Sequence, residues 1–222
     1  PRGSFIYFAK PQQESIFKIE HIKPDSSKNF YCLETFIGAN FSVNLQKFYR
    51  RTSIKESYSD EVVLSSPPLG MPFFDKCSIQ NKIYLYNSDI HHIRNCLHRN
   101  LLPGRFSEEE AYRGMYYYSC DLDEWNPVPK MKRKLSGACI TSDGSLVYMI
   151  GGKCVDGRVE NGFVQALDHR IDKWLELPRT NKSYCNAKSH FLNGKIYVSN
   201  GWNMEVYDPA AGKWDIINCP PI

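Results

Sequence analysis

The sequence predicts an all-β fold made of repeated four-stranded antiparallel units. Three observations carry this prediction: three apolar segments share a tyrosine, three later segments share a tryptophan, and the order of the two is the same each time. The tyrosine segments are KIYLYNS with Tyr84, LVYMIGG with Tyr148 and KIYVSNG with Tyr197. Short apolar runs that end in turn-forming residues are typical of β-strands.

Each tryptophan follows a second short strand and a polar turn. A large apolar residue stands seven positions before each tryptophan, giving the pairs Tyr118 and Trp125, Leu167 and Trp174, and Tyr207 and Trp214. A proline follows each tryptophan after a short extended segment. This arrangement predicts a third and a fourth strand joined by a tight hairpin turn.

A further apolar segment precedes each tyrosine strand, namely PFFDKCSI, LSGACITS and CNAKSHFL, and a short turn joins the two. The repeat unit therefore has four strands. The tryptophans are 49 and then 40 residues apart. Four short strands that recur at this spacing indicate the blades of a β-propeller.

The glycines and tryptophans add a family resemblance. Gly151 and Gly152 end the middle tyrosine strand, and Gly201 has the matching place in the last one. A glycine pair, then Leu-Asp or Tyr-Asp, then Lys-Trp and proline resembles the kelch repeat, although the copy that ends at Trp125 lacks the glycine pair. The resemblance covers about 71–222 and implies a kelch-type β-propeller, either partial or with segments missing.

The recurring anchors of this repeat are expected to be structural. The glycines should let the strand end turn beside the crowded inner part of a blade, where a side chain would clash. The tryptophans should fill the space between neighbouring blades. The residues given a structural role are Tyr84, Tyr118, Trp125, Tyr148, Gly151, Gly152, Leu167, Trp174, Tyr197, Gly201, Tyr207 and Trp214.

The chain divides into a linker remnant and one propeller domain. Residues 1–4, PRGS, resemble the end of a thrombin-site linker and are set aside. The remaining chain, 5–222, is expected to form a single kelch β-propeller domain, whose clear blades are 71–131, 132–180 and 181–222.

Residues 5–70 are expected to hold degenerate blades. FIYFAK, SIFKIEHI and NFYCLE would form one of them, and NFSVNLQKFYRR and DEVVLSSPPL would supply the outer strands of a further incomplete blade. A short capping segment is the alternative for the last two. The total is then four to five blades, fewer than most kelch propellers have.

Function is expected on the face that carries the loops between second and third strands, because such loops vary and commonly bind partners. The first loop is a long insertion, 88–113, the second is KCVDGRVENG, and the third is short. Trp202 is either an exposed binding anchor or a cap on the core. The candidate partner-binding residues are His91, His92, Arg94, Arg99, Arg105, Lys153, Asp156, Arg158, Glu160, Trp202 and Asn203.

The long insertion has other interpretations. A zinc site from its His and Cys side chains matches no structural zinc spacing. A solvated or partly disordered loop is the remaining alternative to a basic, partner-facing one. We expect no metal, no cofactor and no catalytic residue, since the sequence contains no P-loop, GxSxG, HExxH or dinucleotide-binding fingerprint.

Composition excludes several classes of partner. The net charge is +4 and the basic residues are scattered, so nucleic acid is not an expected partner. No apolar run reaches the roughly 18 residues that a membrane span needs. The eight cysteines form no CxxC pair. They are therefore expected to be free thiols in a reducing compartment, which indicates a cytoplasmic protein. Association with the cytoskeleton is a further alternative.

The resemblance implies a protein–protein interaction module and not an enzyme. A frequent context for kelch repeats is the BTB–kelch class, in which the propeller recruits a substrate protein and a separate BTB domain engages a cullin-3 ubiquitin ligase. Cullin-3 would then be a partner only through a BTB domain that this sequence does not contain. The alternative is an actin-associated or cytoskeletal kelch scaffold.

Overall fold

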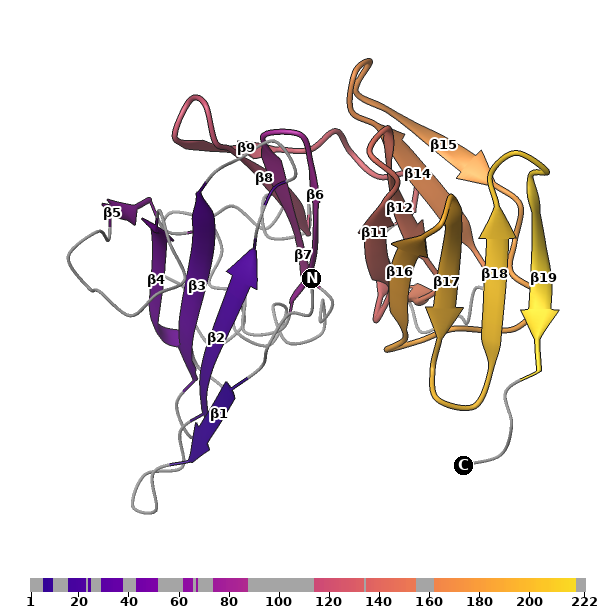
Figure 1. Cartoon of the computed structure of the whole chain (residues 1–222), viewed down its shortest axis with the longest axis horizontal. Coiled ribbons are helices and arrows are strands. Elements are labelled where there is room, and N and C mark those ends of the chain that lie inside the picture. The colour runs from indigo at the N-terminus through magenta and orange to yellow at the C-terminus, as the bar shows by residue number, and fades with distance from the viewer. Residues whose placement is uncertain are drawn as a thin grey trace.

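The structure is a computed structural model, which describes residues 6–9, 16–22, 24, 29–37, 43–51, 62–65, 67, 74–87, 114–133, 135–154 and 162–218. Within these ranges every helix-or-strand element is a β-strand, as Figure 1 shows. The strands form one five-stranded sheet, three four-stranded sheets and one short pair. The predicted all-β fold is therefore confirmed.

Three of the sheets are four-stranded antiparallel meanders, in which each strand pairs with the next one along the chain. Their strands are β6 (Phe74–Ile79), β7 (Lys82–Asn87), β8 (Met115–Ser119) and β9 (Glu124–Pro127); β11 (Cys139–Ser142), β12 (Leu146–Ile150), β14 (Val164–Asp168) and β15 (Lys173–Leu177); and β16 (Lys188–Leu192), β17 (Lys195–Ser199), β18 (Met204–Asp208) and β19 (Lys213–Ile217). This is the predicted strand order of a blade. A short pair of β10 (Leu135–Ser136) and β13 (Lys153–Cys154), which the sequence did not predict, lies beside the middle sheet.

The N-terminal part differs from its prediction. It forms one continuous sheet of β1 (Ile6–Ala9), β2 (Ile16–Ile22), β3 (Phe30–Ile37), β4 (Val43–Arg51) and β5 (Val62–Leu64). The expected division of 5–70 between two incomplete blades was wrong, because β3 and β4 pair along their whole length. The expected pairing of SIFKIEHI with NFYCLE is present, with Ile22 opposite Tyr31.

The spacing of seven residues before each tryptophan has a simple cause in the sheet register. Tyr118 pairs with Trp125, Leu167 with Trp174, and Tyr207 with Trp214 across the hairpin between the third and fourth strands. The residue two positions before each tryptophan has a positive φ, 57° at Asp123, 52° at Asp172 and 65° at Gly212. Aspartate and glycine tolerate this left-handed backbone better than most residues do, so the local sequence supports the turn.

The core lies between consecutive sheets. Tyr31 and Phe48 of the first sheet contact Tyr118 of the second, with ring centroids 5.7 Å and 4.8 Å from the Tyr118 ring. Trp174 is buried in the cluster between the second and third sheets, and Trp214 in the cluster between the third and fourth. Each tryptophan therefore fills the gap between its own blade and the preceding one, where burial of a large aromatic stabilises most.

The indole nitrogens fix the segments that connect one blade to the next. Trp174 Nε1 donates a hydrogen bond to the carbonyl of Pro129 at 2.9 Å, and Trp214 Nε1 donates to the carbonyl of Pro178 at 2.9 Å. Trp125 Nε1 donates in the same way to Ser65, directly after β5, at 2.8 Å. The segment after β5 therefore binds the tryptophan of the second blade, just as the segments after β9 and β15 bind the tryptophans of the third and fourth blades.

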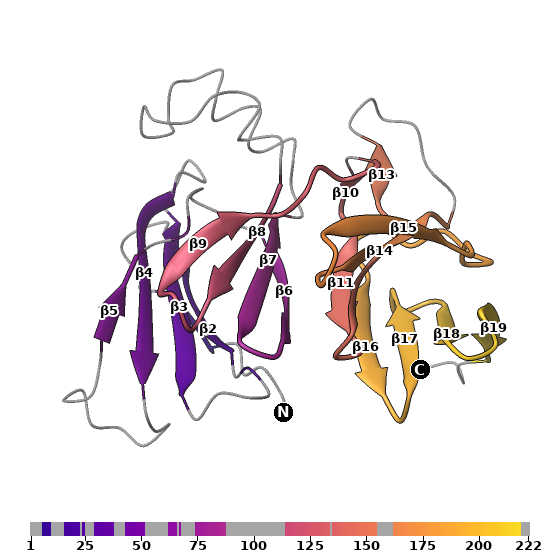
Figure 2. The same cartoon turned by 90° about the horizontal axis from the view of Figure 1, so that it is seen from above.

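The first strands of three blades lie next to one another. Figure 2, seen from above, shows β6, β11 and β16 side by side where their sheets meet, and β11 contacts both neighbours. Asp75 on β6 accepts the backbone N–H of Ile140 at 2.9 Å, and its other oxygen lies 3.5 Å from Nζ of Lys188 on β16. Adjacent innermost strands are the arrangement expected around the axis of a propeller.

Candidate protein-binding face

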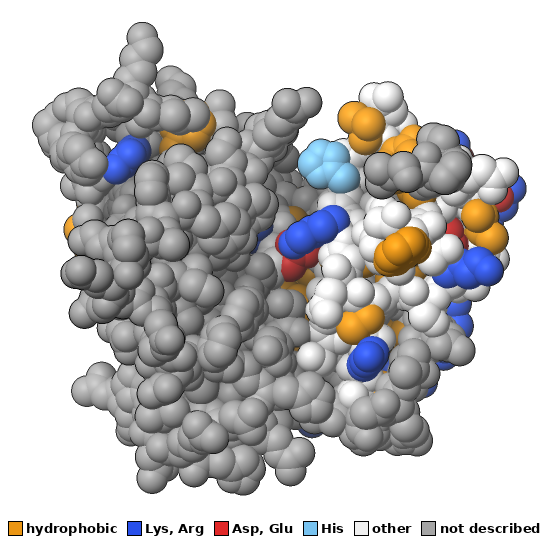
Figure 3. Space-filling model, turned by 90° about the horizontal axis from the view of Figure 1, so that it is seen from below, with side chains coloured by type: hydrophobic (Ala, Val, Ile, Leu, Met, Phe, Trp, Pro, Cys, Tyr) orange, Lys and Arg blue, Asp and Glu red, His pale blue; other side chains and the backbone are white. Residues whose placement is uncertain are grey.

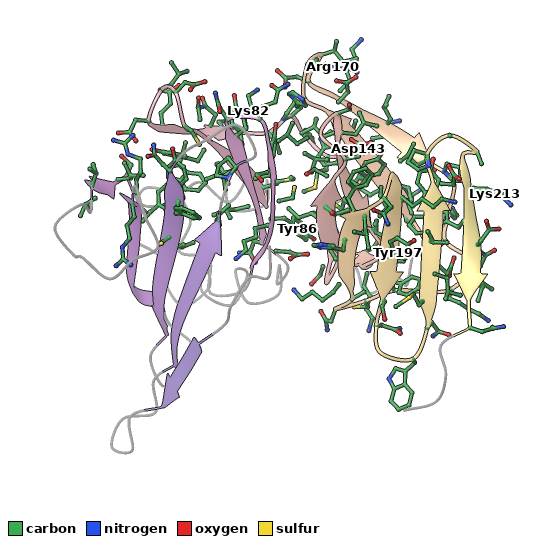
Figure 4. The ribbon with its side chains drawn as sticks, in the orientation of Figure 1. Lys82, Tyr86, Asp143, Arg170, Tyr197 and Lys213 are labelled. Atoms are coloured by element: carbon green, nitrogen blue, oxygen red, sulfur yellow. The ribbon has the colours of Figure 1, made fainter. Side chains whose placement is uncertain are left out.

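The two ends of the blades differ in what they carry. In Figure 1 the turn between β17 and β18 and the connector from β15 to β16 both lie at the lower end. The turns that join the first strand to the second, and the third strand to the fourth, lie at the upper end, where Figure 4 labels Asp143 and Arg170. The lower end therefore groups a loop between second and third strands with a blade-to-blade connector, as a binding face of this fold would.

Trp202 stands at the tip of the lower turn. Its side chain is 88% exposed, and the alternative that it caps the core is therefore wrong. The side-chain oxygen of Asn200 accepts the backbone N–H groups of Trp202 at 3.1 Å and Asn203 at 2.9 Å. The N–H of Asn200 donates to the carbonyl of Asn203 at 3.3 Å, which closes the turn.

This turn presents a large aromatic ring on a fixed backbone. Asparagine at the first position stabilises such turns by bonding its own backbone two residues on. Gly201, with φ of 88°, supplies the left-handed residue that the turn requires. A rigid aromatic side chain gives much contact area and loses little conformational entropy on binding, which suits it to protein recognition.

The remaining predicted partner-binding residues are only partly within the described chain. Lys153 is exposed on β13, opposite Ser136 of β10, and Asn203 is half-buried beside Trp202. The other residues lie outside the described ranges: His91, His92, Arg94, Arg99, Arg105, Asp156, Arg158 and Glu160. The zinc interpretation of the long insertion lies outside them too, and the described residues contain no cluster of three His, Cys, Asp or Glu side chains that could hold a metal ion.

Basic residues on the connectors between blades were missed by sequence reasoning. PKMKRK follows the second blade and PRTNK follows the third, and both begin at the proline whose carbonyl binds an indole. Figure 3, seen from below, shows Lys and Arg side chains spread among hydrophobic ones on the described part of that face. In the sequence these positions are visible as a proline closely followed by Lys and Arg, a pattern that also marks the boundary between two blades.

A buried carboxylate holds one of these connectors. Glu205 is fully buried on β18, and its two oxygens accept the backbone N–H groups of Asn181 and Lys182, each at 2.8 Å. The matching residue one blade earlier is Gln165, also fully buried, whose Nε2 donates to the carbonyl of Arg133 at 3.2 Å. A polar side chain on the third strand thus fixes the connector in both blades.

The described cysteines are free thiols: Cys32, Cys77, Cys120, Cys139, Cys154 and Cys185. Burial raises the pKa of Cys139 to about 12, and burial also raises the pKa of Cys77. Both thiols therefore stay protonated near neutral pH and are poor nucleophiles. In the described part of the chain, no helix has the length and apolar character to cross a membrane.

Stacked four-stranded antiparallel sheets, with a tryptophan between each pair and a glycine pair at a strand end, define the class: these are kelch-type propeller blades. No family model matches the chain. It is 36% identical over 93 residues to an F-box/kelch-repeat protein of Arabidopsis thaliana, which covers 39% of this chain and 23% of the relative. It is 30% identical to Kelch-like protein 41a of Danio rerio over 48% of this chain and 19% of that protein.

A third relative spans more of the chain. Another F-box/kelch-repeat protein of Arabidopsis thaliana is 21% identical over 205 residues, which is 90% of this chain and 44% of the relative. The chain therefore spans less than half the length of each of these relatives. All of them are named as kelch-repeat or Kelch-like proteins, and the recognition of kelch repeats from the sequence is confirmed.

Proposed function

We propose that this chain is the substrate-recruiting kelch region of a BTB–kelch adaptor for a cullin-3 ubiquitin ligase, acting in the cytoplasm. The observation that carries the recruiting role is the Trp202 turn, a large exposed aromatic on a backbone closed by hydrogen bonds. Similarity to Kelch-like proteins supports the BTB context. In this account the cullin contact belongs to a BTB domain and not to the blades.

Two other contexts remain for the same module. The Arabidopsis relatives are named F-box/kelch-repeat proteins, so kelch repeats of this kind also occur together with an F-box. The cytoskeletal alternative would make the same face a contact for actin. A protein-interaction module is common to all three, and they differ in what accompanies the blades.

The test is affinity purification of the full-length protein from its native cells. Cullin-3 should co-purify with it, and Trp202→Ala should leave the cullin in place while it reduces recovery of a recruited substrate. The matched control is Ile171→Ala, which removes a side chain that is 58% exposed on the hairpin between β14 and β15, at the upper end of the preceding blade. Actin co-sedimentation without cullin-3 would instead establish the cytoskeletal alternative.

A further inference from the structure

The joint between the second and third blades contains a buried histidine. His169 directly follows β14, in the turn to β15, and it is only 9% exposed. Leu167, two positions earlier, packs in the cluster between these two blades. The Nε2 atom of His169 is buried and has no hydrogen-bond partner among the described residues. A proton on this nitrogen would be a buried donor without an acceptor, which costs free energy.

A lysine of the second blade acts on this histidine. The ammonium of Lys82, at the start of β7, lies 4.7 Å from the centroid of the Tyr117 ring on β8. Burial lowers the pKa of His169, and the positive charge of Lys82 lowers it further. Burial raises the pKa of Tyr117, and the carboxylate of Asp172 raises it further, so the turn that holds His169 lies within electrostatic reach of the second blade. Figure 4 labels Lys82 and Arg170 at the upper ends of the two blades.

The carboxylates beside His169 act in the opposite direction but do not prevail. Asp168 accepts hydrogen bonds from Nε and Nη2 of Arg170, at 2.9 Å and 2.8 Å, so its charge is already compensated within the turn. Asp168 and Asp172 both favour the protonated imidazole, yet burial and Lys82 together keep the pKa of His169 below its ordinary value. The folded joint therefore disfavours the charged histidine.

The other titratable groups of this joint do not change charge near neutral pH. Burial raises the pKa of Cys77 and of Tyr84, so both stay neutral. Asp75 lies on β6, where its carboxylate accepts the backbone N–H of Ile140 from the third blade at 2.9 Å. Among the described side chains of the joint, His169 alone has an ordinary pKa between about 5.5 and about 7.5.

The next joint, between the third and fourth blades, has apolar residues at both matching positions. Lys82 and Leu146 each stand two positions before the tyrosine of their blade, and His169 and Pro209 each stand five positions before the tryptophan of theirs. Leu146 packs against the cluster between the third and fourth blades. Neither Leu146 nor Pro209 can take up a proton, so acid should act on one joint and not on the other.

We propose that the joint between the second and third blades is an acid-sensitive switch: a proton taken up by His169 from solvent loosens the packing of these two blades and leaves the next joint closed. The pKa of His169 is lower in the folded joint, so an opened joint binds more protons. The stability of the joint is therefore complete above the ordinary pKa of histidine and falls as the pH falls through it, until the folded pKa is passed. This property belongs to the blades themselves and does not depend on the proposed function.

Two tryptophans report on the two joints separately. Trp174 Nε1 donates to the carbonyl of Pro129 across the first of them, and Trp214 Nε1 donates to the carbonyl of Pro178 across the second, each at 2.9 Å. Both tryptophans are 7% exposed, whereas Trp202 is 88% exposed and supplies the reference rate of an open indole. The test measures exchange of the three indole N–H groups with solvent by NMR on the labelled whole chain, at pH about 7.5 and about 5.5.

Acid should reduce the protection of Trp174 and leave that of Trp214 unchanged. The loss should equal the factor that linkage gives from the pKa of His169, measured in the same titration, and the ordinary value of about 6.5. His169→Gln, which is neutral at every pH, should remove the loss. The control His190→Gln, which removes an exposed histidine on β16, should retain it.

Equal losses of protection at the two indoles would overturn the proposal, as would a pKa of His169 that is not below its ordinary value. Both results come from the unmodified chain, so they decide the matter even if a variant does not fold. A loss at Trp174 that persists in His169→Gln would likewise overturn it, because another group would then be the one that takes up the proton.

Discussion

The aligned glycines Gly152 and Gly201 offer a direct test of why the repeat requires glycine. Both have a left-handed backbone, with φ of 93° and 88°. A Cβ at Gly152 would lie 2.9 Å from the carbonyl oxygen of Ser136 and 3.0 Å from the backbone nitrogen of Ala138. A Cβ at Gly201 would meet nothing within 4 Å.

The two alanine variants should therefore differ in stability. A left-handed alanine costs about 1–2 kcal/mol in either place. Overpacking against backbone atoms that cannot rotate away adds about 1–3 kcal/mol. We expect Gly201→Ala to lower the free energy of unfolding by about 1–2 kcal/mol and Gly152→Ala by about 2–5 kcal/mol.

Urea unfolding followed by tryptophan fluorescence measures the difference, and the slope of the transition shows whether the two variants unfold comparably. Gly151→Ala extends the series, because its Cβ would lie 2.2 Å from the carbonyl oxygen of Tyr184 in the connector to the next blade. If Gly152→Ala and Gly201→Ala lose the same stability, the left-handed backbone alone explains the glycines and close packing against the connector does not.

Three further predictions concern the anchors of the blades. Trp174→Ala should lower the free energy of unfolding by about 3–5 kcal/mol in a urea titration, since it leaves a cavity between two blades, and a variant as stable as the parent would refute the blade packing. Glu205→Gln should cost about 1–3 kcal/mol in the same assay, because an amide cannot accept N–H groups at both of its ends; unchanged stability would show that the buried carboxylate does not hold the connector. Hydrogen bonds from Arg170 lower the pKa of Asp168 to about 2, so the contribution of this carboxylate to the free energy of unfolding should be present above its ordinary pKa and lost as the pH falls toward 2. An NMR titration should show that Arg170→Ala raises the pKa of Asp168. An unchanged pKa would exclude the Arg170 side chain as the cause.

The sequence predicted the three later blades well because their signals are local. Turn residues, the hairpin register of Tyr207 with Trp214, and the alternation of buried positions all act within a few residues of one another. The first sheet lacks a glycine pair and a tryptophan, so no motif residue marked where one blade should end and the next begin. The residue pattern of a single strand shows which face is buried but not which other strand it pairs with, so the pairing of β3 with β4 could not be predicted from it.

The candidate site was harder to predict for the same reason. Exposure of Trp202 depends on a turn that Asn200 closes, and the sequence left both its interpretations open. Arg133 and Arg179 both contact Phe163 only because two connectors whose first residues are 49 positions apart meet at that ring. No spacing within the chain shows such a meeting until the blades are stacked.

Site-directed photo-cross-linking tests most directly the claim that the lower end of the blades recruits protein. A photoreactive phenylalanine analogue would replace Trp202 in the full-length protein, and the matched control would carry it at Ile171, which is exposed at the opposite end. The account predicts a covalent adduct with the recruited substrate at position 202 and none at position 171. Adducts of equal yield at both positions, or an adduct at 171 alone, would contradict it.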